Sequence, residues 1–480
     1  MTDQPAAAVA ALAPRPALEP DAIGVAQDTV IGMASAAPAV SVGLTLAALA
    51  AATAYGSGPV LLITAIPMLI IANAYRRLNL WNATCGASFE WVGRAISPYL
   101  GFLTGWLMIA AYITGAVAGV EVIGPSVLAV AGVTAPGRWP DIWIATGITA
   151  VMLLIAVAGI KLTARVQVSM AVIEYVILAA VAVAGLIAVF GHWPGTFPAT
   201  AGWLSPAGIG GKGSLASGLL IAVFIYSGWE GTLYVNEEVK HRRINPGRAA
   251  VWAVVILTIL YALAVTGLQG IVSPARLQAH SASALVYVAG ALGGPAVARL
   301  AALALALSVI AATGTSIVLC ARIIYGMASR HTLPPALARV SPRFATPVQA
   351  SIATGVLLVI ATWAYLLATS IQGAFDAVIN ASGLLFAAFY ILTALATITY
   401  YRRRVTATVR DAITLGILPA AAALFLAWII TESMRTAPAP QNWSLAGIVI
   451  AGLVLMAVAR FVLRSPFFAL AREHDPGIGR

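Results

Sequence analysis

The sequence contains little charge. Only 9% of its 480 residues are Asp, Glu, Lys or Arg, whereas 61% are hydrophobic. A water-soluble domain carries roughly 25% charged residues, so this composition excludes a soluble globular protein. The 43 glycines and 26 prolines fit closely packed membrane helices with local breaks, which lipid tolerates only where protein or a cavity covers the freed backbone.

Cysteine and histidine are also scarce. Cys85 and Cys320 are too few for a disulfide framework, and we expect no disulfide. The five histidines fall in predicted loops or tails, with no spacing that suits a metal or catalytic centre, and no filter-like loop is repeated as in a channel. We therefore expect neither an enzyme nor a bound cofactor.

Long apolar segments dominate what remains. Twelve windows are long enough to span a bilayer, and several begin at or next to a proline, which suits the first turn of a helix. They cover residues 29–53, 59–77, 98–131, 140–160, 165–190, 214–236, 247–272, 295–327, 347–368, 373–400, 411–432 and 443–463. The sequence predicts an all-α membrane protein with twelve transmembrane helices.

The basic residues predict the orientation of these helices. Only Arg138, Lys212, Arg276, Arg299 and Arg435 fall on the predicted outer side, which leaves 22 of the 27 Lys and Arg inside. This split predicts cytoplasmic termini in a cell inner membrane. It also attributes the net charge of +11 to topology and not to nucleic-acid binding.

The order of the windows suggests an internal repeat. The first and sixth windows are each interrupted by small or polar residues, with four uninterrupted windows between them. Two units of five helices insert with opposite orientation, and broken helices at matching positions indicate a transporter site. We predict inverted repeats over 23–190 and 191–405, two further helices over 406–464, a disordered Ala/Pro-rich tail over 1–22, which is not a cleavable signal, and a cytoplasmic tail over 465–480.

The first window contains the predicted break Ser35-Ala36-Ala37-Pro38. Pro38 removes a backbone hydrogen bond in mid-membrane, and its neighbours are small, so local unwinding near Ala36–Val40 should follow. The positive end of the following half-helix would then face an anionic group such as a carboxylate. A simple proline kink is the alternative.

The sixth window contains Glu230, surrounded by Ser227, Gly228 and Gly231. A carboxyl at membrane depth is costly unless it faces a cavity or a partner. Glu230 either contacts substrate directly or is a structural acid bonded to freed backbone groups.

The fifth window contains Glu174, seven residues after Gln167 and therefore on the same helix face. Its apolar surroundings favour the protonated acid, as a proton-coupling carboxyl requires. A buried structural hydrogen bond is the alternative account.

Other polar residues in the windows are less central. We expect Glu121, and Asp376 with Asn380, to lie toward the outer vestibule. The hydroxyl groups of the eighth window can bond back to their own helix or reach a neighbour; they belong to Ser308, Thr313, Thr315 and Ser316.

Two motifs resemble the amino acid, polyamine and organocation transporter superfamily. The run GWEGTLYVNEEVKHRRINPGRA, from Gly228, is similar to the family's broken sixth helix, which ends in GFE and is followed by EE-x-K with Arg and Pro. The run ARIIYGMASRHTLPPALARVSPRFATP, from Ala321, is similar to its R-x-x-Y-x-M-A, LP and TP pattern. The resemblance covers residues 24–464 and implies the leucine-transporter fold, with ten helices in a 5+5 inverted repeat.

The resemblance also implies site residues. The first break would bind a carboxylate, the backbone at Ser227 and Gly228 an amine, and Phe224 would be an aromatic lid. Together with the residues singled out above, the predicted substrate-binding residues are Ser35, Ala36, Ala37, Pro38, Tyr112, Phe224, Tyr226, Ser227, Gly228, Glu230, Thr315 and Ser316. The predicted proton-coupling residues, which the resemblance does not supply, are Glu174 and Glu121.

The chain departs from its relatives at two places. Many of them have a lysine in the fifth helix where this chain has Glu174, so the ionisable group is kept but its charge is reversed. The first break reads SAAPAVS where a G-S-G-x-F type of sequence is usual. These departures prevent a direct transfer of substrate or coupling mechanism from the family.

The leading hypothesis is proton-coupled symport of an amino acid or a related small amine through alternating access in a lipid bilayer. Exchange of one amine for another would need nearly the same sequence. Polyamine or organic-cation transport is the second alternative, because four carboxylates inside the membrane would favour a cation if they faced the cavity. The sequence predicts no nucleic-acid partner and leaves the oligomeric state open.

Overall fold

A computed structural model describes residues 17–475, apart from 54–55, 134–136, 201–202, 204, 206–208, 210–211, 281–282, 369–370 and 438. Most of the predicted disordered tail at 1–22 and the end of the tail at 465–480 therefore lie outside the described residues. Some side chains inside helices are also outside the description; they belong to residues 44–46, 121, 212–213, 274, 368, 371–377 and 439–440.

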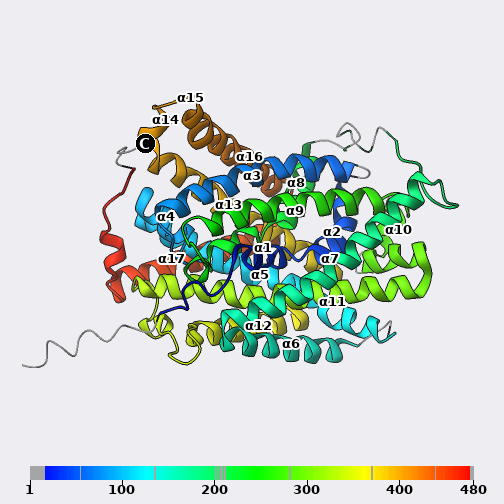
Figure 1. Ribbon diagram of the computed structural model, residues 1–480, viewed down its shortest axis with the longest axis horizontal. Coiled ribbons are helices and arrows are strands. Elements are labelled where there is room, and N and C mark those ends of the chain that lie inside the picture. Colours follow the sequence, from blue (N-terminus) through cyan, green and yellow to red (C-terminus); the bar gives the residue numbers. More distant parts are fainter. Residues whose placement is uncertain are drawn as a thin grey trace, which may run out of the picture.

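The described part is a bundle of long helices that run roughly side by side (Figure 1). The longest helices are α3 (Ser57–Trp81), α5 (Pro98–Val130), α6 (Arg138–Ala158), α7 (Ile160–Phe190), α9 (Asn245–Leu268), α11 (Ala284–Ser329), α12 (Val348–Ala368), α13 (Ile371–Tyr400), α16 (Leu418–Thr436) and α17 (Ala439–Ala457). Shorter helices are α4 (Ser88–Ala95), α10 (Pro274–Ala279), α14 (Arg402–Val405) and α15 (Val409–Asp411).

The predicted fold class is confirmed. Eleven helices of the described part are long and apolar enough to cross a membrane, and a bent pair, Val25–Gly43 with Ala47–Thr53, brings the number to twelve. The two halves of that pair meet at 65°. The described residues form no strand, although an isolated bridge joins Ile23 to Val239.

The first predicted break lies between α1 (Val25–Ser35) and α2 (Pro38–Thr53). Ala37 adopts a left-handed conformation, with φ of 46°, so the helix is interrupted at Ala36 and Ala37. The interruption is shorter than predicted, since Pro38 to Val40 are already helical. Proline suits the first turn of a helix because its missing N–H would have no partner there.

The second predicted break follows α8 (Lys212–Tyr226). Gly228 adopts a left-handed φ of 114°, and a 3₁₀ helix, η6 (Trp229–Leu233), continues the chain. A second short 3₁₀ turn, η7 (Asn236–Glu238), then leads into the loop before α9. Glycine tolerates this φ at no steric cost, so the sequence sets the place where the helix ends.

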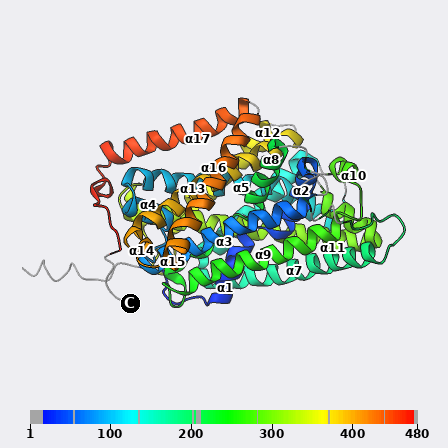
Figure 2. The same ribbon diagram turned by 90° about the horizontal axis from the view of Figure 1, so that it is seen from above.

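The interior of the bundle is formed mainly around α5, which packs against both α11 and α13, and α11 also packs against α7. Helix α17 lies along one edge, away from this interior (Figure 2). Trp443 and Phe461, in and just after α17, are each 73% exposed, as expected for a helix that faces lipid.

A buried ion pair closes the end of the bundle near residue 23. Arg322 of α11 donates to both carboxylate oxygens of Glu238, at 3.0 and 2.9 Å, and neither side chain is exposed. The backbone N–H of Ile23 donates to the Glu238 carbonyl, and the Lys240 N–H donates to the Ile23 carbonyl. The chain entering α1, the segment after η6 and α11 are thereby joined at one point.

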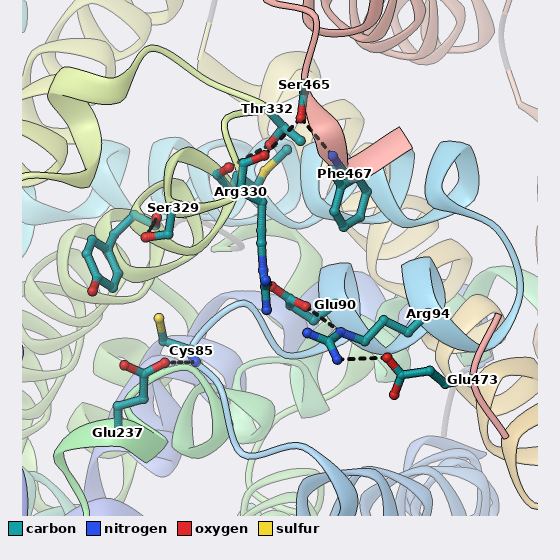
Figure 3. A network of polar contacts seen from close by, with 12 residues as sticks. Cys85, Glu90, Arg94, Glu237, Ser329, Arg330, Thr332, Ser465, Phe467 and Glu473 are labelled. Atoms are coloured by element: carbon teal, nitrogen blue, oxygen red, sulfur yellow. Dashed lines mark hydrogen bonds and ion pairs between the residues drawn. The ribbon is translucent and has the colours of Figure 1, made fainter. Parts of the chain in front are cut away.

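Residues 465–475 run back along the same end of the bundle (Figure 3). The hydroxyl of Ser465 donates to the Arg330 carbonyl at 2.8 Å. Glu90 of α4 pairs with Arg330 and with Arg94, and Arg94 also pairs with Glu473 at 2.9 Å. This alternating network ties the C-terminal segment to α4 and to the end of α11.

An aromatic contact adds to that attachment. The ring of Phe467 stacks on Phe89 of α4, with centroids 4.5 Å apart. Gly93 leaves room for it, since a Cβ at that position would lie 2.6 Å from the Phe467 ring. Burial of such a ring contributes on the order of 2 kcal/mol to stability.

Candidate functional site

A small, partly enclosed cavity of about 60 Å³ lies where the two helix breaks meet. Residues from α1, α2, α5, α8, α11 and α13 line it. The lining residues are Ser35, Ala36, Ala37, Val40, Ser41, Ala111, Tyr112, Gly115, Ala116, Ala118, Gly119, Phe224, Ser227, Val309, Ala312, Thr313, Ser316 and Phe386. Two segments nearly 200 residues apart in the sequence therefore build one site.

Gly228 permits the two breaks to touch. A Cβ at Gly228 would lie 2.6 Å from both the carbonyl carbon of Ser35 and the nitrogen of Ala36. The positive φ of Gly228 also disfavours any other residue. The close approach of the two breaks thus depends on a hydrogen atom in place of a side chain.

Replacing Gly228 by alanine should destabilise the folded protein by at least about 2 kcal/mol, because both backbone strain and steric overlap oppose the methyl group. The measurement is the melting temperature of the purified protein in detergent. Gly447→Ala is the control, since nothing lies within 4 Å of the added methyl group in α17. Equal melting temperatures for the two variants would show that the breaks do not need this contact.

The cavity contains hydroxyl groups but no formal charge. Among the described residues that line it, none is Asp, Glu, Lys or Arg. Helix α2 begins beside the cavity and α8 ends beside it, so a positive and a negative helix end both border the cavity. The first N–H groups of α2, at Ala39 and Val40, already donate to Glu174 and Ser308, so a ligand there would interact with the helix dipole. A ligand with one anionic and one cationic group suits these ends better than a ligand with a single charge.

Glu230 lies behind the cavity wall. Its Oε1 accepts a hydrogen bond from the Tyr112 hydroxyl at 2.8 Å. Its Oε2 accepts from the Tyr390 hydroxyl at 2.6 Å and from the Gly228 N–H at 3.0 Å. Since Tyr112 lines the cavity and Glu230 does not, the carboxyl reaches the cavity only through that tyrosine.

Glu174 binds the start of α2 from the neighbouring helix α7. Its Oε1 accepts the backbone N–H of Ala39 at 2.9 Å, and the adjacent Val40 N–H donates to the Ser308 hydroxyl of α11 at 3.4 Å. Glu174 is fully buried, and its Oε2 has no hydrogen-bond partner in the described part of the chain. The carboxyl thus joins α7 to the positive end of the half-helix that begins at the first break.

The structure brings together most of the predicted substrate-binding residues. Those that line the cavity are Ser35, Ala36, Ala37, Tyr112, Phe224, Ser227 and Ser316. Those that do not are Pro38, Tyr226, Gly228, Glu230 and Thr315.

The residues outside the cavity wall have identifiable structural contacts. The Thr315 hydroxyl bonds back to the Ala311 and Ala312 carbonyls, the alternative anticipated for such hydroxyls. Tyr226 is buried against Tyr261 in an edge-to-face contact. The side chains of Glu121 and Asp376 lie outside the described residues.

Sequence reasoning missed several residues. Phe386 and Ser41 line the cavity, and Tyr390 binds Glu230. A single tyrosine within the apolar run FAAFYIL was a signal that could have identified Tyr390. Asp28, in the first turn of α1, is fully buried with no partner for either oxygen among the described residues; it precedes the first predicted window by one position.

No metal centre is evident in the residues that the structure describes. They contain no group of three or more His, Cys, Asp or Glu side chains placed to hold an ion. Cys85 and Cys320 are both buried, and neither forms a disulfide. The polar chemistry of the described site therefore consists of hydroxyl groups, helix ends and the two buried glutamates.

Comparison with known proteins agrees with this geometry. A model of the family described as amino acid permease matches residues 27–455. The gamma-aminobutyric acid permease of Bacillus subtilis (strain 168) is 23% identical over 298 residues, which are 60% of this chain and 60% of that protein. The matched region thus spans three-fifths of that relative. It supports the assignment of a family more strongly than the assignment of a substrate.

Proposed function

This chain belongs to the amino acid permease family, and from that premise we propose that it carries an amino acid or a closely related small amine across a membrane by proton-coupled alternating access. The observation that carries the proposal is the uncharged cavity between two helix breaks. Broken helices give a transporter oriented backbone groups for ligand charges without a charged side chain.

The cavity favours an amino acid over a purely cationic substrate. A carboxylate would bind near Ser35 to Ala37, where α2 begins, and an ammonium group near Ser227, where α8 ends. Neither Glu174 nor Glu230 lines the cavity, so the described carboxylates do not support the polyamine alternative. The printed name of the Bacillus subtilis relative, a gamma-aminobutyric acid permease, adds support for an amino acid.

Glu174 is the proposed coupling residue. The charged carboxylate is stabilised by the Ala39 N–H and the helix end, whereas the neutral acid is favoured by burial in apolar surroundings. Binding of a proton would therefore weaken the attachment of α2 to α7. Such a change links protonation to movement of the broken helices against their neighbours.

The first test is thermal stabilisation of the detergent-purified protein by a ligand panel, because a ligand that binds only the folded state raises its melting temperature. The panel contains standard amino acids, gamma-aminobutyric acid, polyamines and simple amines. Stabilisation by compounds with both amine and carboxylate is the expected result. Stabilisation by polyamines alone would overturn the proposed substrate class.

Liposome uptake then separates symport from exchange. An inward proton gradient should drive accumulation of the ligand into liposomes that contain none. Uptake that occurs only when the liposomes are preloaded with substrate would identify an exchanger and exclude proton symport.

Replacing Phe224 by alanine should weaken substrate binding by about tenfold, because a buried aromatic contact contributes on the order of 1.5 kcal/mol. Phe224 lines the cavity and packs beside Gly115 of α5. The apparent affinity measured by uptake tests this, with Phe190→Ala as the control because Phe190 is 62% exposed at the end of α7. Unchanged affinity in the Phe224 variant would contradict its assignment as a lid.

A further inference from the structure

A second, larger groove of about 570 Å³ opens on the outside of the bundle between α1, α7 and α9. The three helices pack against one another, and α7 and α9 lie side by side in Figure 2. Tyr175 of α7 lines the groove, and Ile173 and Val176, close to it in the sequence, are exposed apolar side chains, as expected for a helix that faces lipid. The groove is therefore open to the bilayer and separate from the central cavity.

The groove changes in polarity along its length. Arg248, Trp252 and Ile256 all line it and are spaced four residues apart on α9, so they occupy one helix face at successive turns. Trp252 is 59% exposed and Ile256 is 38% exposed. From the end of α9 inward, the wall is cationic, then aromatic, then aliphatic.

The facing wall is supplied by α1, the helix that precedes the first break. Its lining residues are apolar except for Thr29, whose hydroxyl bonds to the Val25 carbonyl of its own helix. The Tyr175 hydroxyl of α7 is buried and has no hydrogen-bond partner among the described residues. The groove thus offers a long apolar surface with polar groups at few points.

Arg248 is the charged residue among the described lining residues of the groove, and a second arginine lies near it. Arg76 of α3 packs against Gly247, the neighbour of Arg248, so the like charges of the two arginines repel each other. Gly247 allows this approach, because a Cβ there would lie 2.8 Å from the Arg76 Cα. In the part of the chain that the structure describes, no carboxylate pairs with any of these arginines, so an external anion would relieve their repulsion.

We propose that this groove binds an anionic phospholipid, with its phosphate group at Arg248 and an acyl chain along Trp252, Ile256 and α1. The order of charged, aromatic and aliphatic residues matches the order of layers in one leaflet of a bilayer. A free phosphate would use only the arginines and leave the apolar wall uncovered. The lipid would contact α1 directly and so stabilise its position beside α7 and α9.

The test is lipid binding to delipidated protein, measured by native mass spectrometry with phosphatidylglycerol or phosphatidylethanolamine. Phosphatidylglycerol should bind more tightly than phosphatidylethanolamine. Arg248→Ala should weaken phosphatidylglycerol binding about five-fold, since each arginine near an anionic membrane surface contributes roughly that factor. Trp252→Ala should weaken it as well.

Arg410→Ala is the matched control, because Arg410 is an exposed arginine of another basic segment and does not line the groove. Equal weakening by Arg410→Ala and Arg248→Ala would overturn the proposal in favour of general surface charge. Full binding by Arg248→Ala, or equal binding of the two lipids, would overturn it outright. Because the measurement needs no transport, its failure would leave the proposed function unaffected.

Discussion

Replacing Arg322 by methionine should destabilise the protein by about 3–5 kcal/mol, the largest effect expected of a single substitution described here. Arg322 and Glu238 are fully buried and joined by two hydrogen bonds, so removing the guanidinium leaves an unpaired carboxylate in the interior. The midpoint of thermal or denaturant-induced unfolding in detergent provides the measurement.

The pH dependence of that loss can be stated in advance. Burial raises the pKa of the Glu238 carboxyl, and Arg322 opposes the rise. Without Arg322 the pKa in the folded state should rise further above its value in the unfolded chain. The variant should therefore be least stable at high pH. Its loss of stability relative to the wild-type protein should become smaller as the pH falls and Glu238 binds a proton.

Two controls separate ion pairing from packing. The double variant Arg322→Met with Glu238→Leu should recover most of the stability, because a buried ion pair can be replaced by apolar residues of similar size at little cost. Arg435→Met should cost less than about 0.5 kcal/mol, since Arg435 is 72% exposed in its pair with Glu432. A double variant no more stable than Arg322→Met would contradict this explanation.

Replacing Glu174 by glutamine should abolish the pH dependence of uptake. As the pH rises and Glu174 loses its proton, the uptake rate of the wild-type protein should fall by up to about tenfold per pH unit. Glutamine keeps an oxygen for the Ala39 N–H but cannot titrate, so the variant should transport equally at pH 5.5 and pH 7.5. Uptake into liposomes at fixed internal pH provides the comparison.

Glu432→Gln is the matched control for Glu174, because it removes a carboxyl from α16 that pairs with the nearby Arg435. This control should keep the wild-type pH profile. A wild-type profile in Glu174→Gln would remove Glu174 from the coupling mechanism, and the partnerless carboxyl of Asp28 in α1 would become the next residue to test.

The fold was largely predictable because a bilayer imposes a minimum length on each apolar segment. Every predicted window coincides with described helices, and both predicted breaks occur. Hydropathy could not predict α4, because eight residues are too few to span and their burial depends on α5 and on Phe467. Hydropathy placed the start of the eighth window at residue 295, whereas α11 begins at Ala284. The helix continues through a kink at Gly293 and Gly294, and hydropathy does not show that helices on the two sides of a kink are joined.

The site was predictable only in part. Local sequence identified the broken segments, because proline and glycine act on the backbone where they stand. It could not distinguish Ser316, which lines the cavity, from Thr315, which bonds back to its own helix. Nor could it place Glu230 behind Tyr112, because that arrangement depends on contacts between residues 118 positions apart.

The C-terminal segment has a consequence for the order in which the protein is made. Residues 465–475 follow the described membrane-spanning helices along the chain and leave the ribosome after them. Until then Arg94 lacks Glu473, and the ring of Phe89 lacks the stacked ring of Phe467. The contacts at the α4 end of the bundle therefore form after the described spanning helices have been made, and a chain that stops before residue 465 would leave the Phe89 ring without this cover.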